Sequence, residues 1–484
     1  MPRAEGHSPL AQKHTGAGSS GLADRVSQYT NNGVLNQISG ILFVVKNVLA
    51  IAYHYPPIAS PGAERMRAFA RDLLVHGYRL LPVTTSTYGV DGSPDVLRIG
   101  EPVGLFRSLL NAEQKAASVD VRSRIRTDAG VLSRVVGWVR DRVMIPDGQI
   151  AWCVPAFFAC LAEIRRSDVR AIYTSSPPHS AHLLGLMLKR ATGLPWVAEF
   201  RDVWTHDPVD VFLREGSRRL AMEQTMERAV AIEADALVGV TERACDYIGT
   251  LAGADKVTCV SNGFDRTRAP RIHPSTTLGI NSDAKKDKKE ENDGVAESND
   301  EVLRLAHIGS FSASHPLRSP DVLVRAVASF GEEVELTLVG PLTSGEKDRV
   351  EQLGDGNVRM TGMVAREEAG RFQHEADVLV LVDHARTHPS TNVPSKCYEY
   401  LAAGKPILAM TPVGATRDLL DEVGGAVCVD PADEEGVRGA IGALVEGKRE
   451  GRLGELVASE EKLGMYRREV LAGELAGVFD GVTD

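Results

Sequence analysis

The sequence of 484 residues lacks the features that mark several large classes of protein. Its six cysteines include no CxxC pair and no spaced Cys/His set, so neither a zinc site nor a disulfide framework is indicated. No run of about eighteen uncharged apolar residues is present, so no membrane-spanning helix is predicted. The 55 basic residues are outnumbered by 65 acidic ones, which argues against a general nucleic-acid binder.

The residues that are present predict a globular protein with more than one core. Hydrophobic residues make up 43% of the chain, and 484 residues exceed what one core usually serves. We expect a reduced, cytoplasmic protein with buried thiols. Residues 1–40 are polar over most of their length and rich in Gly and Ser, and we expect a disordered extension there rather than a signal peptide.

Alternating strands and helices over 41–265 predict a first Rossmann-like domain with a parallel sheet. It opens with a buried strand at 48–53 and a helix at 63–76 that stops at Gly77, a residue suited to a helix end. Further strands are predicted at 79–84, 171–174, 196–200, 236–240 and 257–260, and helices at 180–192 and 218–233.

A second Rossmann-like domain is predicted over 302–458, after a linker at 266–301 that holds a charged, disordered insertion. Its strands are expected at 303–308, 336–339, 358–361, 378–382, 407–410 and 426–429. Residues 459–484 are predicted to hold a last helix, over about 459–479, that could cross back to the first domain. The fold class is therefore α/β, with two doubly wound parallel sheets that face a cleft.

The most informative segment is 392–407, with the sequence NVPSKCYEYLAAGKPI. Pro394 suits the first position of a helix, and Gly404 suits its end. The free N–H groups at the start of this helix offer a site for a diphosphate, to which Lys396 adds a positive charge. Glu399, a little over one turn later, could accept both hydroxyls of a ribose. A surface helix with a favourably placed Glu is the alternative interpretation.

Four segments, in order along the chain, resemble glycosyltransferase family 4. Residues 393–410 resemble the family signature, in which a helix ending in EYLAAGKPIL carries the ribose-binding Glu. Residues 52–78, 173–204 and 260–265 resemble the first loop and helix, the middle β-α-β unit and the hinge of the family. The resemblance implies a GT-B fold whose second domain binds most of a nucleotide-diphosphate sugar.

The resemblance also implies which residues bind the donor. Glu399 matches the second Glu of the family's E-x7-E pattern, whereas the position of the first Glu, close to the transferred sugar in the family, is Thr391. Arg318 is the residue after the first strand of the second domain that can supply the expected charge, unless it is an ordinary solvated arginine. The implied donor site comprises Gly62, Gly309, Arg318, Val393, Ser395, Lys396 and Glu399.

Other residues are implied in catalysis and on the acceptor side. The candidate catalytic residues are His179, Asp202, Arg318 and Lys396, and the candidate acceptor-side residues are Arg65, His182 and Arg201. Two structural interpretations stay open. A histidine in this region could cap or pack a helix, and Arg201 with Asp202 could form a buried ion pair.

The resemblance implies a retaining transfer to a hydroxyl of a glycan or lipid-linked acceptor, without metal or cofactor, in polysaccharide or glycoconjugate biosynthesis. A nucleotide-sugar epimerase of GT-B type and a non-catalytic nucleotide-binding relative are the alternatives. The stretch Arg107–Arg142 holds eight basic and four acidic residues. It is compatible with peripheral contact with an anionic membrane, on the inner face of the plasma membrane, or with a helix packed on its own domain.

Overall fold

The structure is a computed structural model that describes residues 35–38, 41–58, 60–89, 92–93, 95–102, 144–206, 217–265, 301–386 and 388–484. The chain divides into two units, 1–46 and 47–484, each of which is described by itself. In the first unit, β1 (Leu35–Ile38) and β2 (Ile41–Val44) pair as antiparallel strands. Leu35–Ile38 are therefore a strand, although they belong to the extension for which the sequence predicts disorder.

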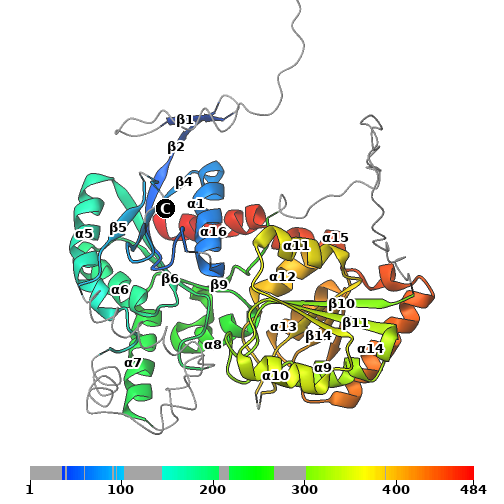
Figure 1. Cartoon of the computed structure of the whole chain (residues 1–484). Helices are drawn as coiled ribbons and strands as arrows, with labels where there is room; N and C mark the ends of the chain where they lie inside the picture. The colour runs from blue at the N-terminus through cyan, green and yellow to red at the C-terminus, as the bar shows by residue number, and fades with distance from the viewer. Residues whose placement is uncertain are drawn as a thin grey trace, which may run out of the picture. The chain divides into compact units, whose positions relative to one another are not determined.

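The second unit contains two parallel sheets, of which the first has the strand order β5-β4-β3-β6-β7-β8-β9 (Figure 1). Its strands are β3 (Lys46–Ile51), β4 (Tyr78–Thr85), β5 (Leu97–Ile99), β6 (Val169–Ser176), β7 (Trp196–Phe200), β8 (Ala236–Gly239) and β9 (Val257–Cys259). Its helices are α1 (Pro61–Asp72), α5 (Cys153–Arg166), α6 (Ser180–Thr192), α7 (Arg218–Glu233) and α8 (Glu242–Ala252). The short 3-10 helices are η1 (Leu73–His76), η2 (Ile150–Trp152) and η3 (Ala254–Lys256).

Helix α1 illustrates why the sequence forms these elements where it does. The side chain of Ser60 accepts a hydrogen bond from the backbone N–H of Ala63, and Pro61 occupies the first helical position, where no N–H is needed. After the turn of η1 the chain reaches Gly77, whose φ of 83° is left-handed. The predicted helix end at Gly77 is confirmed.

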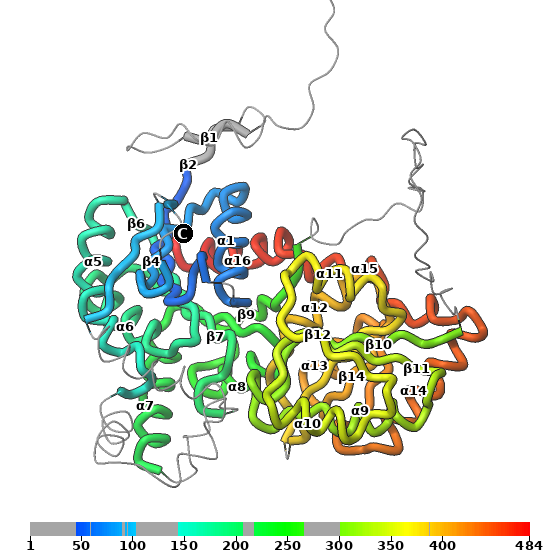
Figure 2. Tube along the Cα trace, viewed as in Figure 1, coloured from blue at the N-terminus to red at the C-terminus, as the bar shows by residue number. Residues whose placement is uncertain are grey.

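Alternate residues of the first sheet pack into two different cores. Leu49 and Ile51 of β3 point to the core that contains residues of α5, α6 and α7. Val48 and Ala50 point to the core that contains residues of α1 and of the C-terminal helix α16 (Arg468–Thr483). Figure 2 shows α16 beside α1, so the last residues of the chain complete the first domain.

The second sheet has the strand order β12-β11-β10-β13-β14-β15. Its strands are β10 (Leu303–Ile308), β11 (Val334–Val339), β12 (Val358–Gly362), β13 (Val378–Val382), β14 (Ile407–Met410) and β15 (Ala426–Val429). Its helices are α9 (Asp321–Ala328), α10 (Ser344–Leu353), α11 (Arg366–Glu375), α12 (Ser395–Ala402), α13 (Ala415–Val423) and α14 (Glu434–Arg449), with the 3-10 turns η5 (Gly331–Glu333) and η6 (Leu453–Leu456). One face packs on α9 and α14 and the other on α12 and α13, so the predicted doubly wound α/β fold is confirmed.

The C-terminal segment differs from the single helix predicted over 459–479. It forms α15 (Glu460–Leu463), η7 (Gly464–Tyr466) and α16, with Arg467 extended between them at φ −71° and ψ 133°. The break has a tertiary cause. Phe264 donates a backbone hydrogen bond to the carbonyl of Tyr466 at 3.1 Å and accepts one from the backbone N–H of Arg468 at 3.1 Å. This pairing holds Arg467 in an extended conformation beside Phe264.

Two sequence-based hypotheses fall on residues outside the described ranges. These are the membrane contact of the basic stretch Arg107–Arg142 and the disorder of the charged insertion in the linker at 266–301, of which only residue 301 is described. Within the described ranges, no helix combines the length and the apolar character needed to cross a membrane.

Both sheets reverse their strand order beside their first strand. The reversal lies between β3 and β6 in the first sheet and between β10 and β13 in the second. In open α/β sheets, ligands bind in the crevice outside the carboxyl ends of the strands at this switch point. A ligand-binding site is therefore expected at the loops after β3, β6, β10 and β13.

Candidate active site

The switch point of the second sheet is formed by the residues that directly follow β10 and β13. Gly309 follows β10, and Asp383 follows β13, which pairs with β10 in the parallel sheet. Helix α12, which follows β13 in the chain, is fixed against the same end of β10. The hydroxyl of Tyr400 accepts a hydrogen bond from the backbone N–H of Ile308 at 2.9 Å. The predicted phosphate-binding helix is thus tied to the switch point.

Lys396 lies directly over Gly309. Any side chain at position 309 would collide with the Lys396 ammonium, and Gly309 has a φ of 141° that other residues rarely adopt. Burial and the positive charge of Arg318 lower the pKa of Lys396. A bound anion would raise the pKa of Lys396 again, because it would stabilise the charged ammonium against burial and against the repulsion from Arg318. The site therefore favours a negatively charged ligand.

Arg318 reaches the same region and is held by Asp383. Its Nε and Nη2 atoms donate to Oδ1 of Asp383 at 3.2 and 3.1 Å. Burial alone would raise the pKa of Asp383, but the hydrogen bond from His384 and the charge of Arg318 hold it well below its usual value. Asp383 is therefore a buried carboxylate that stays ionised.

Two histidines border this ion pair. The rings of His315 and His384 stack with centroids 3.7 Å apart and planes 7° from parallel. Burial, followed by the neighbouring His384 and Arg318, lowers the pKa of His315 to about 4. The ring of His315 is therefore neutral at neutral pH, and its Nδ1 accepts a hydrogen bond from the backbone of Leu317 at 3.3 Å.

The other predicted donor residues lie around the start of α12. The helix begins at Ser395 with Pro394 as its cap, one residue later than predicted. Val393 is buried, Ser395 is half-buried, and Glu399 is exposed one turn into the helix. The first N–H groups of any helix lack partners within the helix, so this end can receive phosphate oxygens.

Thr391, which stands where the family has its first Glu, is only 4% exposed. Its carbonyl accepts a hydrogen bond from the hydroxyl of Thr241 at 2.6 Å. The same hydroxyl caps α8 by accepting the N–H of Ala244 at 3.1 Å. This position therefore contacts the first domain through its backbone.

Arg65, which the resemblance assigns to the acceptor side, forms a buried ion pair. It is 5% exposed, forms an ion pair with the fully buried Glu199 at 2.8 Å and donates to the carbonyl of Val260 at 2.7 Å. Burial would raise the pKa of Glu199, but Arg65 and the hydroxyl of Ser175 lower it. Arg65 thus joins α1, β7 and the segment after β9 through buried contacts, and its place on the acceptor side stays a prediction.

Gly62 and Arg201 are brought together at the end of the first sheet. Arg201 donates to Oγ of Ser175 at 3.1 Å and to the carbonyl of Pro177 at 2.9 Å. Its guanidinium lies against Gly62, where any side chain would collide with it. The close approach that this glycine permits is therefore made by Arg201. Asp202 follows directly and is half-buried.

The two candidate histidines of the first domain have different surroundings. His182 is fully buried, with Nδ1 2.8 Å from the hydroxyl of Thr174 and its ring on Phe200, and its acceptor-side role stays a prediction. His179 lies at the start of α6 and stacks on Trp204, with centroids 4.7 Å apart. Burial and the charge of Arg201 lower the pKa of His179 to about 3, so it is a neutral ring.

Known protein families match both halves of this arrangement. Residues 63–263 match the glycosyl transferase 4-like domain, and residues 303–447 match the glycosyl transferases of group 1. The chain is a GT-B glycosyltransferase of the group 1, family 4 type. No curated protein matches it in sequence.

Solved structures resemble the fold of this glycosyltransferase over most of its length. Sucrose-phosphate synthase from Thermosynechococcus elongatus has a TM-score of 0.59 at 16% identity, with 90% of this chain and 98% of that chain covered. Anabaena HepE in complex with UDP and glucose has a TM-score of 0.54 at 15% identity, with 90% and 100% covered. The lipopolysaccharide outer core galactosyltransferase WaaB has a TM-score of 0.54 at 9% identity, with 90% and 99% covered.

Sequence reasoning did not select the acidic and imidazole residues at the switch point of the second sheet. Asp383, His384 and His315 were not predicted, although Asp383 and His384 directly follow the predicted strand at 378–382. For Asp383 and His384, the signal in the sequence is their position at the carboxyl end of a predicted central strand. Within the described ranges, no group of three or more His, Cys, Asp or Glu side chains is arranged to hold a metal ion.

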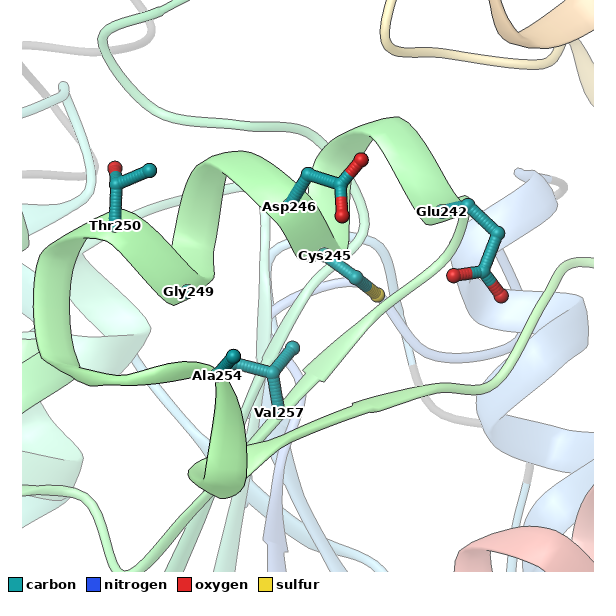
Figure 3. Close-up of a pocket in the computed structure, with 7 residues that line it drawn as sticks. All are labelled: Glu242, Cys245, Asp246, Gly249, Thr250, Ala254 and Val257. Atoms are coloured by element: carbon teal, nitrogen blue, oxygen red, sulfur yellow. The ribbon is translucent and has the colours of Figure 1, made fainter.

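A cavity of about 440 Å³ lies elsewhere, beside α8 (Figure 3). Its lining residues come from α8, η3 and β9, and they are Glu242, Cys245, Asp246, Gly249, Thr250, Ala254 and Val257. The lining contains two carboxylates and no lysine or arginine. It therefore does not suit a diphosphate, and the charges at the switch point of the second sheet do.

Proposed function

We propose that this glycosyltransferase moves a sugar from a nucleotide-diphosphate sugar to a hydroxyl of a glycan or lipid-linked acceptor, with retention of configuration. The observation that carries the proposal is the meeting of Lys396, Arg318 and the start of α12 at the switch point of the second sheet. The UDP and glucose in the HepE structure, which shares the fold, support a donor of this class.

The diphosphate is the part of the donor that the second domain is best suited to bind. Lys396 and Arg318 supply positive charge, and the N–H groups of α12 supply hydrogen bonds. Glu399, exposed one turn into the same helix, is the proposed acceptor for the ribose hydroxyls. The sugar would then extend from the diphosphate toward the first domain.

The chemistry requires one bond to break and one to form at the anomeric carbon. The bond to the diphosphate breaks, the acceptor hydroxyl bonds to the same face of the sugar, and its proton passes to the departing phosphate. Lys396, Arg318 and the helix start stabilise the charge that develops on the diphosphate. Because these groups are cations and fixed dipoles, we propose that no metal is needed, and EDTA should leave the rate unchanged.

The first domain is proposed to bind the acceptor near His179, Arg201 and Asp202. Since His179 is neutral at physiological pH, its role is that of a hydrogen-bond partner for a hydroxyl rather than a charged acid. Domain closure would bring this region to the donor and exclude water.

A membrane surface is the proposed source of a lipid-linked acceptor. The support is the basic stretch Arg107–Arg142, which lies outside the described residues. Replacing Arg134, Arg140 and Arg142 by Glu should reduce sedimentation with anionic vesicles. Unchanged sedimentation would contradict membrane contact while leaving the transfer reaction as proposed.

Binding of nucleotides tests the donor site directly. UDP, GDP, ADP and CMP are added to the wild type, and one diphosphate at a hundred times its Kd should add about 2.7 kcal/mol to the free energy of unfolding. Glu399→Ala should lose most of this stabilisation. Glu351→Ala, at an exposed position on α10, is the matched control and should keep it. If no diphosphate stabilises the wild type, the proposed donor site is wrong.

A further inference from the structure

We propose that Asp383 is a positioning residue, whose carboxylate aims Arg318 at the diphosphate without contacting it. This inference rests on the proposed function, because it names what holds the proposed diphosphate site in place. It concerns three side chains, only one of which the family resemblance singles out.

Oδ1 of Asp383 is the common acceptor of the cluster. It lies 3.2 and 3.1 Å from Nε and Nη2 of Arg318, and 2.9 Å from both the backbone N and the Nδ1 of His384. The backbone of Asp383 is fixed in turn, since its N–H donates to the carbonyl of Met410 at the end of β14 at 2.8 Å. With 4% of its surface exposed, the carboxylate is anchored to the sheet.

This anchoring decides the direction of Arg318. A long arginine side chain on a loop loses considerable rotamer freedom when it binds a phosphate. Here Nε and Nη2 are already held, while Nη1 and the second hydrogen of Nη2 take no part in the bond to Asp383. Arg318 is 20% exposed, so part of the guanidinium can reach a ligand. The cost of ordering it is met before the diphosphate arrives.

The same carboxylate fixes the orientation of His384. Because Nδ1 lies on a carboxylate oxygen, Nδ1 carries a proton and donates a hydrogen bond to that oxygen. The ring is further held by its stack on His315. His384 is 5% exposed. The hydrogen bond to Asp383 and the stacking on His315 together fix the orientation of its ring.

A carboxylate beside a diphosphate would ordinarily repel it. Asp383 avoids this conflict because it is buried and its charge is met by Arg318 and Arg386. Lys396 adds a further positive charge on the Gly309 side. The region remains positive with Asp383 ionised, which is consistent with a supporting role and not with direct contact.

A double-mutant cycle tests the proposal. Calorimetry measures the Kd of the diphosphate that stabilises the wild type, and of inorganic pyrophosphate, for the wild type, Asp383→Asn, Arg318→Ala and the double variant. Because a hydrogen bond between charged groups is lost, Asp383→Asn should weaken binding of both probes about tenfold. If Asp383 acts through Arg318, the double variant should bind no more weakly than Arg318→Ala.

Two controls keep the cycle interpretable. Glu434→Gln removes a carboxylate that pairs with Arg325 at 2.8 Å away from the switch point, and it should leave both Kd values unchanged. Asp383→Glu keeps the charge but lengthens the side chain, and it should weaken binding several-fold even if Asp383→Asn does not fold.

The outcomes separate this proposal from the proposed function. A wild type that binds no diphosphate contradicts the proposed function. A wild type that binds, with effects of Asp383→Asn and Arg318→Ala that multiply in the double variant, contradicts the positioning role alone. Unchanged binding in Asp383→Asn or, where that variant does not fold, in Asp383→Glu would also contradict it.

Discussion

Buried histidines make the stability of this glycosyltransferase depend on pH at the scale of single residues. Burial lowers the pKa of both His179 and His307 to about 3, whereas an unfolded chain keeps the usual value of about 6.5. Between these values the unfolded chain binds a proton that the folded chain does not. The free energy of unfolding should therefore fall as the pH drops from 6.5 toward 3.

His307 allows a direct test of this pH effect. It is 4% exposed, with Nδ1 2.9 Å from the carbonyl of Val380, a contact that the amide of an asparagine can retain. At pH 5 its contribution is about 2 kcal/mol, so His307→Asn should shrink the difference in stability between pH 7.5 and 5.0 by that amount. Urea unfolding measures it. His374→Asn, at an exposed position, is the control. An equal change in the pH dependence of its stability would contradict the role assigned to the burial of His307.

Candidate site residues can be predicted from the sequence where a residue with suitable chemistry lies inside a recognisable local motif. Lys396 and Glu399 are predicted as donor-site residues because a proline, a helix start and a signature motif coincide at 392–407. The burial of Arg65 and His182 is not predicted from the sequence, because burial is a tertiary property. The carboxylate that pairs with Arg65 is Glu199, which lies 134 residues away on β7. No local pattern reveals that pair.

At the scale of elements, the fit of a helix on its sheet depends on where a glycine lies. Gly185 faces the sheet from α6, and a Cβ there would come within 2.6 Å of Thr174 Cγ2 and 2.7 Å of Trp196 Nε1. That Nε1 donates to the hydroxyl of Thr174 at 2.9 Å, so a methyl group would press on a buried hydrogen bond. Gly439 of α14 is exposed, with no heavy atom within 4 Å of such a Cβ.

The two glycines should therefore respond in opposite directions to alanine. Gly185→Ala should destabilise the protein by about 1–3 kcal/mol, because overpacking outweighs the gain in helix propensity. Gly439→Ala should stabilise it by about 0.5–1 kcal/mol, because only the propensity term remains. Chemical unfolding compares them. Equal shifts of the same sign would show that α6 can move away from β6 and β7.

Strands were the most predictable elements, and the C-terminal segment the least. Strands β7, β10, β13, β14 and β15 have the predicted bounds. Two of them, β13 and β14, are buried, continuous apolar runs, the pattern of a strand covered on both faces. The break between α15 and α16 carries no such signal. Arg467 is extended because Phe264, far back in the chain, pairs with it, and no sequence window contains both residues.

At the scale of the whole molecule, the segment by which the chain leaves the first domain lies beside the segment by which it returns. The segments around Phe264 and Arg467 run side by side, and Asp265 pairs with Arg71 of α1 at 2.9 Å and with Arg468 of α16 at 2.8 Å. Two distant parts of the sequence are therefore joined to α1 at the same carboxylate. We therefore expect the stability of the first domain to depend on the last helix, which packs in its core.

Phe479 tests this dependence. It is fully buried, with its ring 5.1 Å from that of Tyr78 and 5.6 Å from that of Tyr173, both in the first sheet. Removing a buried phenylalanine costs about 3–5 kcal/mol, so Phe479→Ala should destabilise the first domain although the residue lies near the C-terminus.

Tryptophan fluorescence can report this change selectively. All four tryptophans of the chain lie between positions 138 and 204, so fluorescence follows the first domain while far-ultraviolet circular dichroism follows both. Phe479→Ala should move the fluorescence transition to lower denaturant, whereas Met465→Ala, at a position 47% exposed, should leave it in place. Ile441→Ala removes a side chain from the core of the second sheet. If the domains unfold separately, it should shift the unfolding transition seen by circular dichroism and leave the fluorescence transition unchanged. An unmoved fluorescence transition in Phe479→Ala would mean that the first domain folds without α16.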